Sequence, residues 1–163
     1  ISPRDWSSDV CSSDLCGLIT PDLVPDEAAD WIAASDAHGL DRIFLVAPSS
    51  SDERIASTVA ACRGWVYATA VMGVTGARTS TSSLAPELVR RVRAISPDVL
   101  IGVGLGVSDG VQAAEVSGYA DAAIVGSALV KTLIAAEDAG TPGDLTGLRA
   151  VVADLAAGVR GRA

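Results

Sequence analysis

Five short apolar runs recur along the chain, and longer amphipathic stretches separate them. The runs cover residues 17–20, 42–47, 65–70, 99–104 and 122–125. They are nearly continuous in apolar residues and do not alternate with polar ones, which is typical of strands buried on both faces of a parallel sheet. Their first residues are 25, 23, 34 and 23 positions apart, which leaves room for a helical crossover each time. The pattern predicts five βα units.

The stretches between and after these runs have helical spacing and carry helix start and stop signals. The first, 27–38, places Ala28, Ile32 and Ala33 on one face and ends before Gly39, a common helix stop. The second follows a Ser-rich cap. The predicted helices cover residues 27–38, 52–62, 86–95, 108–116, 126–136 and 145–157.

Five βα units leave two architectures open. One is an open doubly wound sheet, which these residues would complete. The other is a (β/α)₈ barrel of typically about 250 residues, of which this chain would hold the last five units. The length favours the first architecture, whereas the glycines at the ends of the strands favour the second.

The first fifteen residues do not share this pattern. The chain begins with Ile1, and residues 6–10 and 11–15 nearly repeat each other, as WSSDV and CSSDL. Residues 4–15 resemble a translated sequencing adapter, and a natural polar tail is the alternative. We therefore expect residues 1–15 to be an artefactual or disordered tail, and we exclude them from the fold.

Composition excludes several classes of function. The chain has 20 acidic and 12 basic residues, a net charge of −8, which argues against nucleic-acid binding. The densest basic cluster, Arg90, Arg91 and Arg93, is interpreted as a solvated helix face. No apolar run approaches the about 20 residues of a membrane span, and no secretory signal is evident. Three cysteines and one histidine suggest neither a disulfide framework nor a zinc site, so we expect a cytoplasmic protein.

A long polar loop follows the run at 65–70. It begins with Gly73-Val74-Thr75-Gly76 and continues into a series of hydroxyl residues. Glycines let the backbone bend and approach a ligand closely, and long βα loops of this kind commonly act as lids. A loose surface connection is the alternative.

Two further strand ends carry glycines. The segment 102–109 resembles a dinucleotide fingerprint, but Val107 and Asp109 stand where the third glycine would be required, so a Rossmann site is not supported. The run at 122–125 leads through Gly126 and Ser127 directly into a helix. The amides of such a helix start, with the Ser127 hydroxyl, can bind an anion such as phosphate. The alternative is a simple helix cap.

Taken together, these motifs resemble the tryptophan synthase alpha chain. The segments that carry the resemblance are 17–23, 42–48, 73–76, 104–108 and 126–131, in order and at the right spacing. The resemblance covers about residues 16–160. It implies that residues 16–163 are the C-terminal portion of a single (β/α)₈ barrel domain, an α/β fold.

That family is a lyase that cleaves indole-3-glycerol phosphate to indole and glyceraldehyde 3-phosphate in tryptophan biosynthesis. The resemblance implies no cofactor in this chain, a beta chain that carries pyridoxal phosphate, and an αββα heterotetramer. By motif, Tyr67 would contact the indole ring and Thr75 would help to close the lid. The residues that would bind the substrate phosphate are Gly76, Gly106, Gly126 and Ser127.

The resemblance places the acid/base Glu and Asp of the family upstream of this chain. No catalytic residue is therefore assigned here, and Asp22, which lies at a strand end, is not nominated. Leu105 stands where an aromatic residue is common in the family. We expect these residues alone to be inactive, because acid/base catalysis typically supplies about 10²–10⁴-fold.

Two other functions stay open. One is a different phosphate-binding barrel enzyme of aromatic amino-acid biosynthesis with the same glycine-bearing strand ends. The other is a truncated, non-catalytic barrel fragment that binds phosphate ligands or a partner chain.

Overall fold

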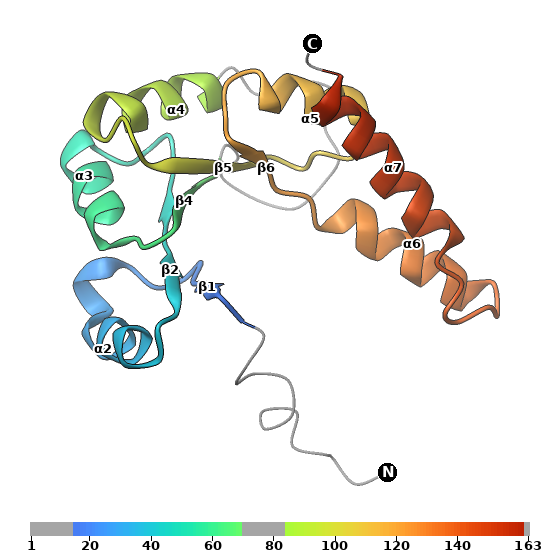
Figure 1. Ribbon diagram of the computed structural model, residues 1–163, viewed down its shortest axis with the longest axis horizontal. Coiled ribbons are helices and arrows are strands. Elements are labelled where there is room, and N and C mark those ends of the chain that lie inside the picture. The colour runs from blue at the N-terminus through green and yellow to red at the C-terminus, as the bar shows by residue number, and fades with distance from the viewer. Residues whose placement is uncertain (1–14, 70–83, 162–163) are drawn as a thin grey trace, which may run out of the picture.

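The computed structural model describes residues 15–69 and 84–161 (Figure 1). Short parallel strands alternate with helices along the chain, as predicted, and the helix ends lie within three residues of the predicted positions. The strands are β1 (Gly17–Ile19), β2 (Asp41–Ile43), β3 (Leu45–Val46), β4 (Trp65–Thr69), β5 (Leu100–Gly104) and β6 (Ala122–Ala123). The helices are η1 (Pro25–Glu27), α2 (Ala29–His38), α3 (Asp52–Ala61), α4 (Leu84–Ile95), α5 (Gly110–Ser117), α6 (Ser127–Asp138) and α7 (Thr146–Arg160).

Neighbouring strands follow one another in sequence order, and every pair is parallel. β1 pairs with β2, and β3, β4, β5 and β6 form a second sheet in that order. The predicted strand at 42–47 is divided at Phe44, whose carbonyl still accepts from the amide of Tyr67 at 3.1 Å. A doubly wound sheet reverses its strand order at a switch point, and the described strands show no such reversal.

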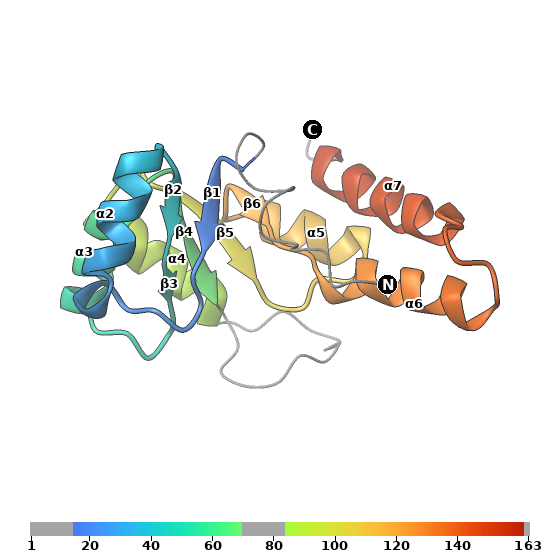
Figure 2. The ribbon, with the colours of Figure 1, turned by 90° about the horizontal axis from the view of Figure 1, so that it is seen from below.

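The helices cover one face of this curved array of strands. In Figure 1 they form an outer arc, and the strands lie on its concave side. The α6–α7 hairpin extends away from the sheet, as Figure 2 shows from another direction. Parallel strands inside and helices outside are the arrangement of a (β/α) barrel, here only part of the circle.

The hydrophobic core lies between the strands and the helices around them. Alternate residues of the strands point outward into it, such as Val66 and Ala68 of β4 and Ile101 and Val103 of β5. Helix α4 contributes Leu88 and other apolar residues from one face. The large, fully buried residues of the core are Val46, Ile55, Val66, Leu88, Val92, Ile101, Val103 and Val116.

Two sequence predictions about polar and small residues are wrong. Ala33 is exposed, and Ser35 is the buried residue of α2, where its hydroxyl donates to the carbonyl of Ile32 and accepts from Arg42 of β2. Arg91 does not lie on a solvated face. Its guanidinium bonds Asp52 at 2.6 Å and the carbonyls of Pro48 and Ser50, which ties α4 to the start of α3.

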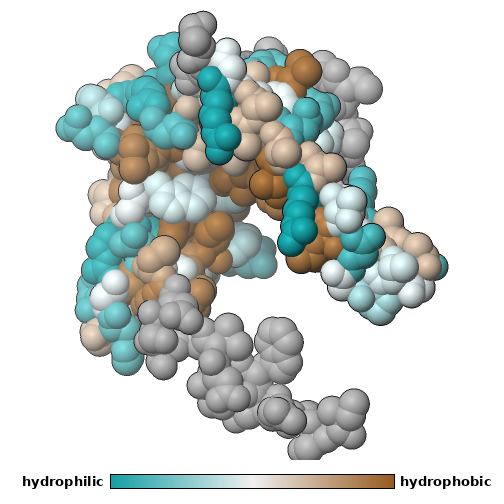
Figure 3. Space-filling view, turned by 45° about the vertical axis from the view of Figure 1, so that its right-hand side comes forward, coloured by the Kyte–Doolittle hydropathy of each residue, from teal (hydrophilic) through white to brown (hydrophobic). Residues whose placement is uncertain are grey.

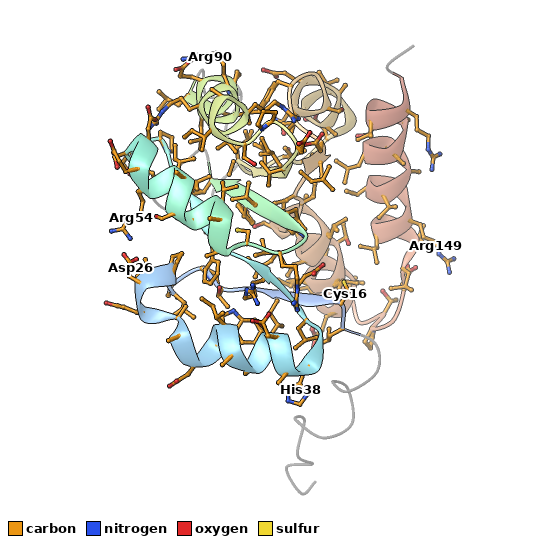
Figure 4. The ribbon with its side chains drawn as sticks, turned by 60° about the vertical axis from the view of Figure 1, so that its left-hand side comes forward. Cys16, Asp26, His38, Arg54, Arg90 and Arg149 are labelled. Atoms are coloured by element: carbon orange, nitrogen blue, oxygen red, sulfur yellow. The ribbon has the colours of Figure 1, made fainter. Side chains whose placement is uncertain are left out.

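Ion pairs join other elements that are distant in sequence. Arg93 of α4 pairs with Asp121 at 2.9 Å, and the same Asp121 carboxylate accepts from the amide of Ile101 at the start of β5. Arg54 of α3 lies 3.2 Å from Asp26 of η1, and Figure 4 shows the two side chains facing each other.

Helix α7 crosses α5 at very short range. A Cβ on Gly158 would overlap the carbonyl oxygen of Gly110 and would lie 2.7 Å from the Cα atom of Gly110. The Asp154 carboxylate accepts from the Gly110 amide at 2.7 Å, and Asp109 caps the same turn by accepting from the amide of Gln112. The first turn of α5 is therefore held both locally and by α7.

Within residues 15–69 and 84–161, no helix is both long and apolar enough to span a membrane.

Candidate substrate site

The concave face of the strands carries the side chains that point away from the helices. Since Val66 and Ala68 of β4 point into the core, Trp65, Tyr67 and Thr69 point to the concave side. On β5 the concave positions are Leu100, Gly102 and Gly104, and the two glycines among them have no side chains. Leu45 of β3 is in register with Tyr67 on one side, and Gly102 is in register with it on the other.

Tyr67, which was predicted to contact an indole ring, is the middle residue of β4, and its ring reaches toward the carboxyl end of this face. Its ring crosses β5 diagonally, so that a Cβ on Gly104 would overlap the Tyr67 hydroxyl and come within 2.5 Å of Cζ. The residue is half-buried, and burial raises the pKa of its phenol. Tyr67 therefore presents a neutral, partly apolar surface at neutral pH.

Gly106 and Gly126 follow adjacent strands at equivalent positions. Gly102 of β5 pairs with Ala122 of β6, and each glycine lies four residues beyond its member of that pair. Beyond the last paired residues, the Ile124 amide still donates to the carbonyl of Val103 at 2.8 Å. Since the carboxyl ends of parallel strands meet at one edge, this arrangement brings both glycines to the same end of the sheet as Tyr67.

The backbone at these two glycines is open to solvent. Gly106 is exposed and has φ +79°, a conformation that favours glycine. Gly126 is exposed and is the N-cap of α6, and a Cβ placed on it would meet nothing within 4 Å. A ligand can therefore approach the backbone closely at both positions.

The start of α6 has the properties of an anion site. Ser127 is its first residue and is exposed, and no side chain caps this end. The start of α2 is also uncapped, whereas Ser51 and Asp109 cap α3 and α5. The first amides of a helix have no partners within the helix, and the helix dipole adds a partial positive charge there. Both effects favour a phosphate group.

The remaining sequence predictions for the site have different outcomes. Thr75 and Gly76 lie outside the described residues. Leu105 is half-buried and packs against the hydrophobic core, and Asp22 is exposed. Among the described residues, no group of three His, Cys, Asp or Glu side chains could hold a metal ion.

Sequence reasoning missed Trp65 and Gly102, which lie next to Tyr67. Gly102 could have indicated them, because a glycine inside a buried strand often marks the close approach of another group.

Hydrophobic side chains are exposed in and around the hollow that these elements enclose. Figure 3 shows hydrophobic residues gathered in a hollow between the sheet and the α6–α7 hairpin. The exposed large hydrophobic residues of the strands and of α6 are Leu18, Ile19, Leu100, Val130, Leu133 and Ile134. A contiguous exposed apolar patch on a soluble protein commonly marks a surface on which something packs.

Comparison with known proteins identifies the family. The profile of the tryptophan synthase alpha chain family matches residues 5–158. The chain belongs to this family.

Relatives of known sequence support the assignment. The tryptophan synthase alpha chain of Mycobacterium avium is 59% identical over 158 residues, which are 97% of this chain and 55% of the relative. That of Acidothermus cellulolyticus is 64% identical over 144 residues, or 88% of this chain and 52% of the relative. The chain thus spans about half the length of the curated tryptophan synthase alpha chains that it matches.

Solved structures agree with the fold. A structure of Mycobacterium tuberculosis tryptophan synthase superimposes with a TM-score of 0.78 at 60% identity, covering 88% of this chain and 51% of that chain. The tryptophan synthase α2β2 complex of Pyrococcus furiosus gives 0.73 at 30% identity, with 86% and 55% covered. The predicted fold class, a partial tryptophan synthase alpha (β/α)₈ barrel, is confirmed.

Proposed function

We propose that this chain is the C-terminal part of a tryptophan synthase alpha subunit, a lyase that cleaves indole-3-glycerol phosphate to indole and glyceraldehyde 3-phosphate. The observation that carries the proposal is the common location of two groups of residues. Gly106, Gly126 and the uncapped start of α6 lie at the same end of the sheet as the aromatic side chain of Tyr67. One group suits a phosphate, and the other suits an indole ring.

The residues of this chain bind and orient the substrate. The amides at the start of α6 and the Ser127 hydroxyl donate to phosphate oxygens, and the exposed backbone at Gly106 allows the phosphate to approach. Tyr67 packs against the indole ring. Thr75 and Gly76 lie outside the described residues, and by the resemblance they would contact the bound substrate and its phosphate.

The bond-breaking step needs groups from upstream. Protonation of indole C3 makes the ring a leaving group, and the bond from C3 to the glycerol carbon breaks as the hydroxyl on that carbon loses its proton and becomes the aldehyde. A Glu and an Asp in the upstream part of the barrel perform these proton transfers. Residues 16–163 are then the C-terminal portion of one barrel domain and are inactive by themselves.

The proposal also specifies the surroundings of the chain. Three more βα units would pair with the edges at β1 and β6 and cover the exposed hydrophobic residues of the hollow. The subunit would join a beta chain in an αββα assembly, as the α2β2 complex from P. furiosus does. The beta chain would carry pyridoxal phosphate, the alpha chain would need no cofactor, and the assembly would work in the cytoplasm.

A chimeric subunit tests the proposal. Residues 16–163 replace the matching part of the M. avium alpha chain, which supplies the upstream residues. This chain matches 55% of that relative. We expect the chimera to release indole from indole-3-glycerol phosphate and residues 16–163 alone to release none. A chimera that folds without releasing indole contradicts the proposed reaction. If it still binds inorganic phosphate, the non-catalytic binding fragment is favoured instead.

A substitution at the phosphate site sharpens this test. In the chimera, Ser127→Asp places a negative charge at the start of α6 and should raise the KM by at least about tenfold through repulsion of the phosphate. Lys131→Met removes the charge of an exposed side chain one turn further along the same helix and is the matched control. An equal effect of both changes would contradict phosphate binding at the helix start.

A further inference from the structure

Two aromatic rings lie across two glycines on the concave face. The ring of Trp65 crosses Gly102, where an added Cβ would lie 2.6 Å from Cζ3 and 2.9 Å from Cε3. The ring of Tyr67 crosses Gly104 in the same way, one step nearer the carboxyl end. The two rings stack with their centroids 6.1 Å apart and their planes 26° apart.

Strand β5 gives the Tyr67 ring no side chain to pack against. The residue in register with Tyr67 is Gly102, and the Tyr67 hydroxyl lies over Gly104. Trp65 is the ring that stacks on Tyr67 within the described part of the chain. The tilt of the Tyr67 ring therefore depends on where the Trp65 ring lies.

The position of Trp65 depends in turn on Gly102. Besides the Trp65 ring, the Cδ1 atom of Ile124 lies 3.1 Å from the point that a Cβ on Gly102 would occupy. A methyl group there has no free space, because both neighbours are large and the nearer one is a rigid ring. An alanine at this position would lift Trp65 from the strand.

We infer that Trp65 is a positioning residue, which holds the Tyr67 ring at the angle at which it packs against the indole ring of the substrate. Gly102 leaves the space that the Trp65 ring occupies. The inference rests on the proposed function of the site. In this arrangement Trp65 contacts Tyr67, the predicted contact residue, and touches no reacting atom itself.

The test uses the chimeric subunit and its KM and kcat for indole-3-glycerol phosphate. Trp65→Ala and Gly102→Ala should each raise the KM by about tenfold, the scale of a small misfit in an apolar pocket, and change kcat far less. Trp65→Phe should restore most of the loss seen with Trp65→Ala. The double variant Trp65→Phe/Gly102→Ala should have a lower KM than Gly102→Ala, because the smaller ring leaves room for the methyl group.

A second cycle separates positioning from general support of the fold. In a Tyr67→Ala background, Trp65→Ala should raise the KM no further, since there is no phenol ring left to position. Full additivity of the two changes would overturn the inference. Trp31→Phe, on helix α2, is the control and should leave the KM unchanged.

The unsubstituted chimera distinguishes the two possible failures. If it releases no indole, the proposed function fails. If it is active and the Trp65 and Gly102 variants have the same KM as the unsubstituted chimera, the proposed function stands and the positioning role is wrong. A fall in thermal stability with an unchanged KM would also overturn the inference, because it would show a purely structural role.

Discussion

The phenol ring of Tyr67 lies across Gly104, and its hydroxyl occupies the space that the first side-chain carbon of any other residue would need. A strand residue next to the candidate substrate site thus lacks a side chain because a ring from the neighbouring strand occupies the space. The aromatic side chain comes from one strand, and the space for it comes from the next.

Gly104→Ala tests this relationship. In the chimeric subunit, the methyl group should displace the Tyr67 ring and raise the KM for indole-3-glycerol phosphate by at least about tenfold. Adding Tyr67→Phe should not relieve the overlap, because Cζ and Cε1 would still lie 2.5 and 2.8 Å from the new carbon. An unchanged KM in Gly104→Ala would mean that the ring moves aside without consequence for binding.

The crossing of α7 over α5 predicts a specific loss of stability. Gly158→Ala should lower the free energy of unfolding by about 1–3 kcal/mol, because the methyl group would overlap the Gly110 backbone. Gly147→Ala in the same helix is the control. Its Cβ would lie 3.5 Å from the nearest atom, so it should be neutral or stabilise by up to about 1 kcal/mol. Urea unfolding of the two chimeric variants measures the difference, and equal stabilities would refute the close crossing.

Two adjacent arginines should differ sharply. Arg91→Ala removes the bonds to Asp52 and to two loop carbonyls, and should lower the free energy of unfolding by about 1–3 kcal/mol. Arg90→Ala removes an exposed pair with Glu87 and should cost less than about 1 kcal/mol. Arg91→Lys should not restore stability, because one ammonium group cannot replace the planar guanidinium across three acceptors. Urea titrations of the three variants provide the comparison.

The two tyrosines predict alkaline behaviour. Burial raises the pKa of Tyr67 and of Tyr119 above the ordinary value near 10. The folded state therefore favours the neutral phenols, and this stabilisation is fully present below about pH 10 and is lost as the pH rises through the folded-state pKa values. The free energy of unfolding should fall above pH 10, and it should fall less steeply in Tyr67→Phe. A slope unaffected by Tyr67→Phe and by Tyr119→Phe would contradict this assignment.

Much of this fold was predictable from local sequence. Apolar runs without alternation located the strands, although in the described residues β4 buries only alternate side chains, those toward the helices. Gly39 ends α2 in the left-handed conformation, at φ +68°, and the Ser51 side chain caps α3, as their residue types indicated. The equivalent positions of Gly106 and Gly126 followed from the parallel order of two consecutive strands.

Contacts between distant segments were not predictable in this way. Arg91 was interpreted from its charge and its arginine neighbours, whereas its role depends on two carbonyls more than 40 residues away. The burial of Ser35 involves the side chain of Arg42, which comes from another element. Composition and periodicity describe one segment at a time, so they contain no information on such pairs.

The bond between Asp154 and the Gly110 amide joins residues 44 positions apart, and this separation has a consequence for synthesis on the ribosome. Helix α5 emerges well before α7, so its first turn lacks one of its two acceptors until residue 154 has left the exit tunnel. The segment immediately before that turn contains Gly106. The nascent chain therefore completes the anchoring of the loop that contains Gly106 only after residue 154 has emerged, and a message that stops before residue 154 would yield a sheet whose loop lacks that anchor.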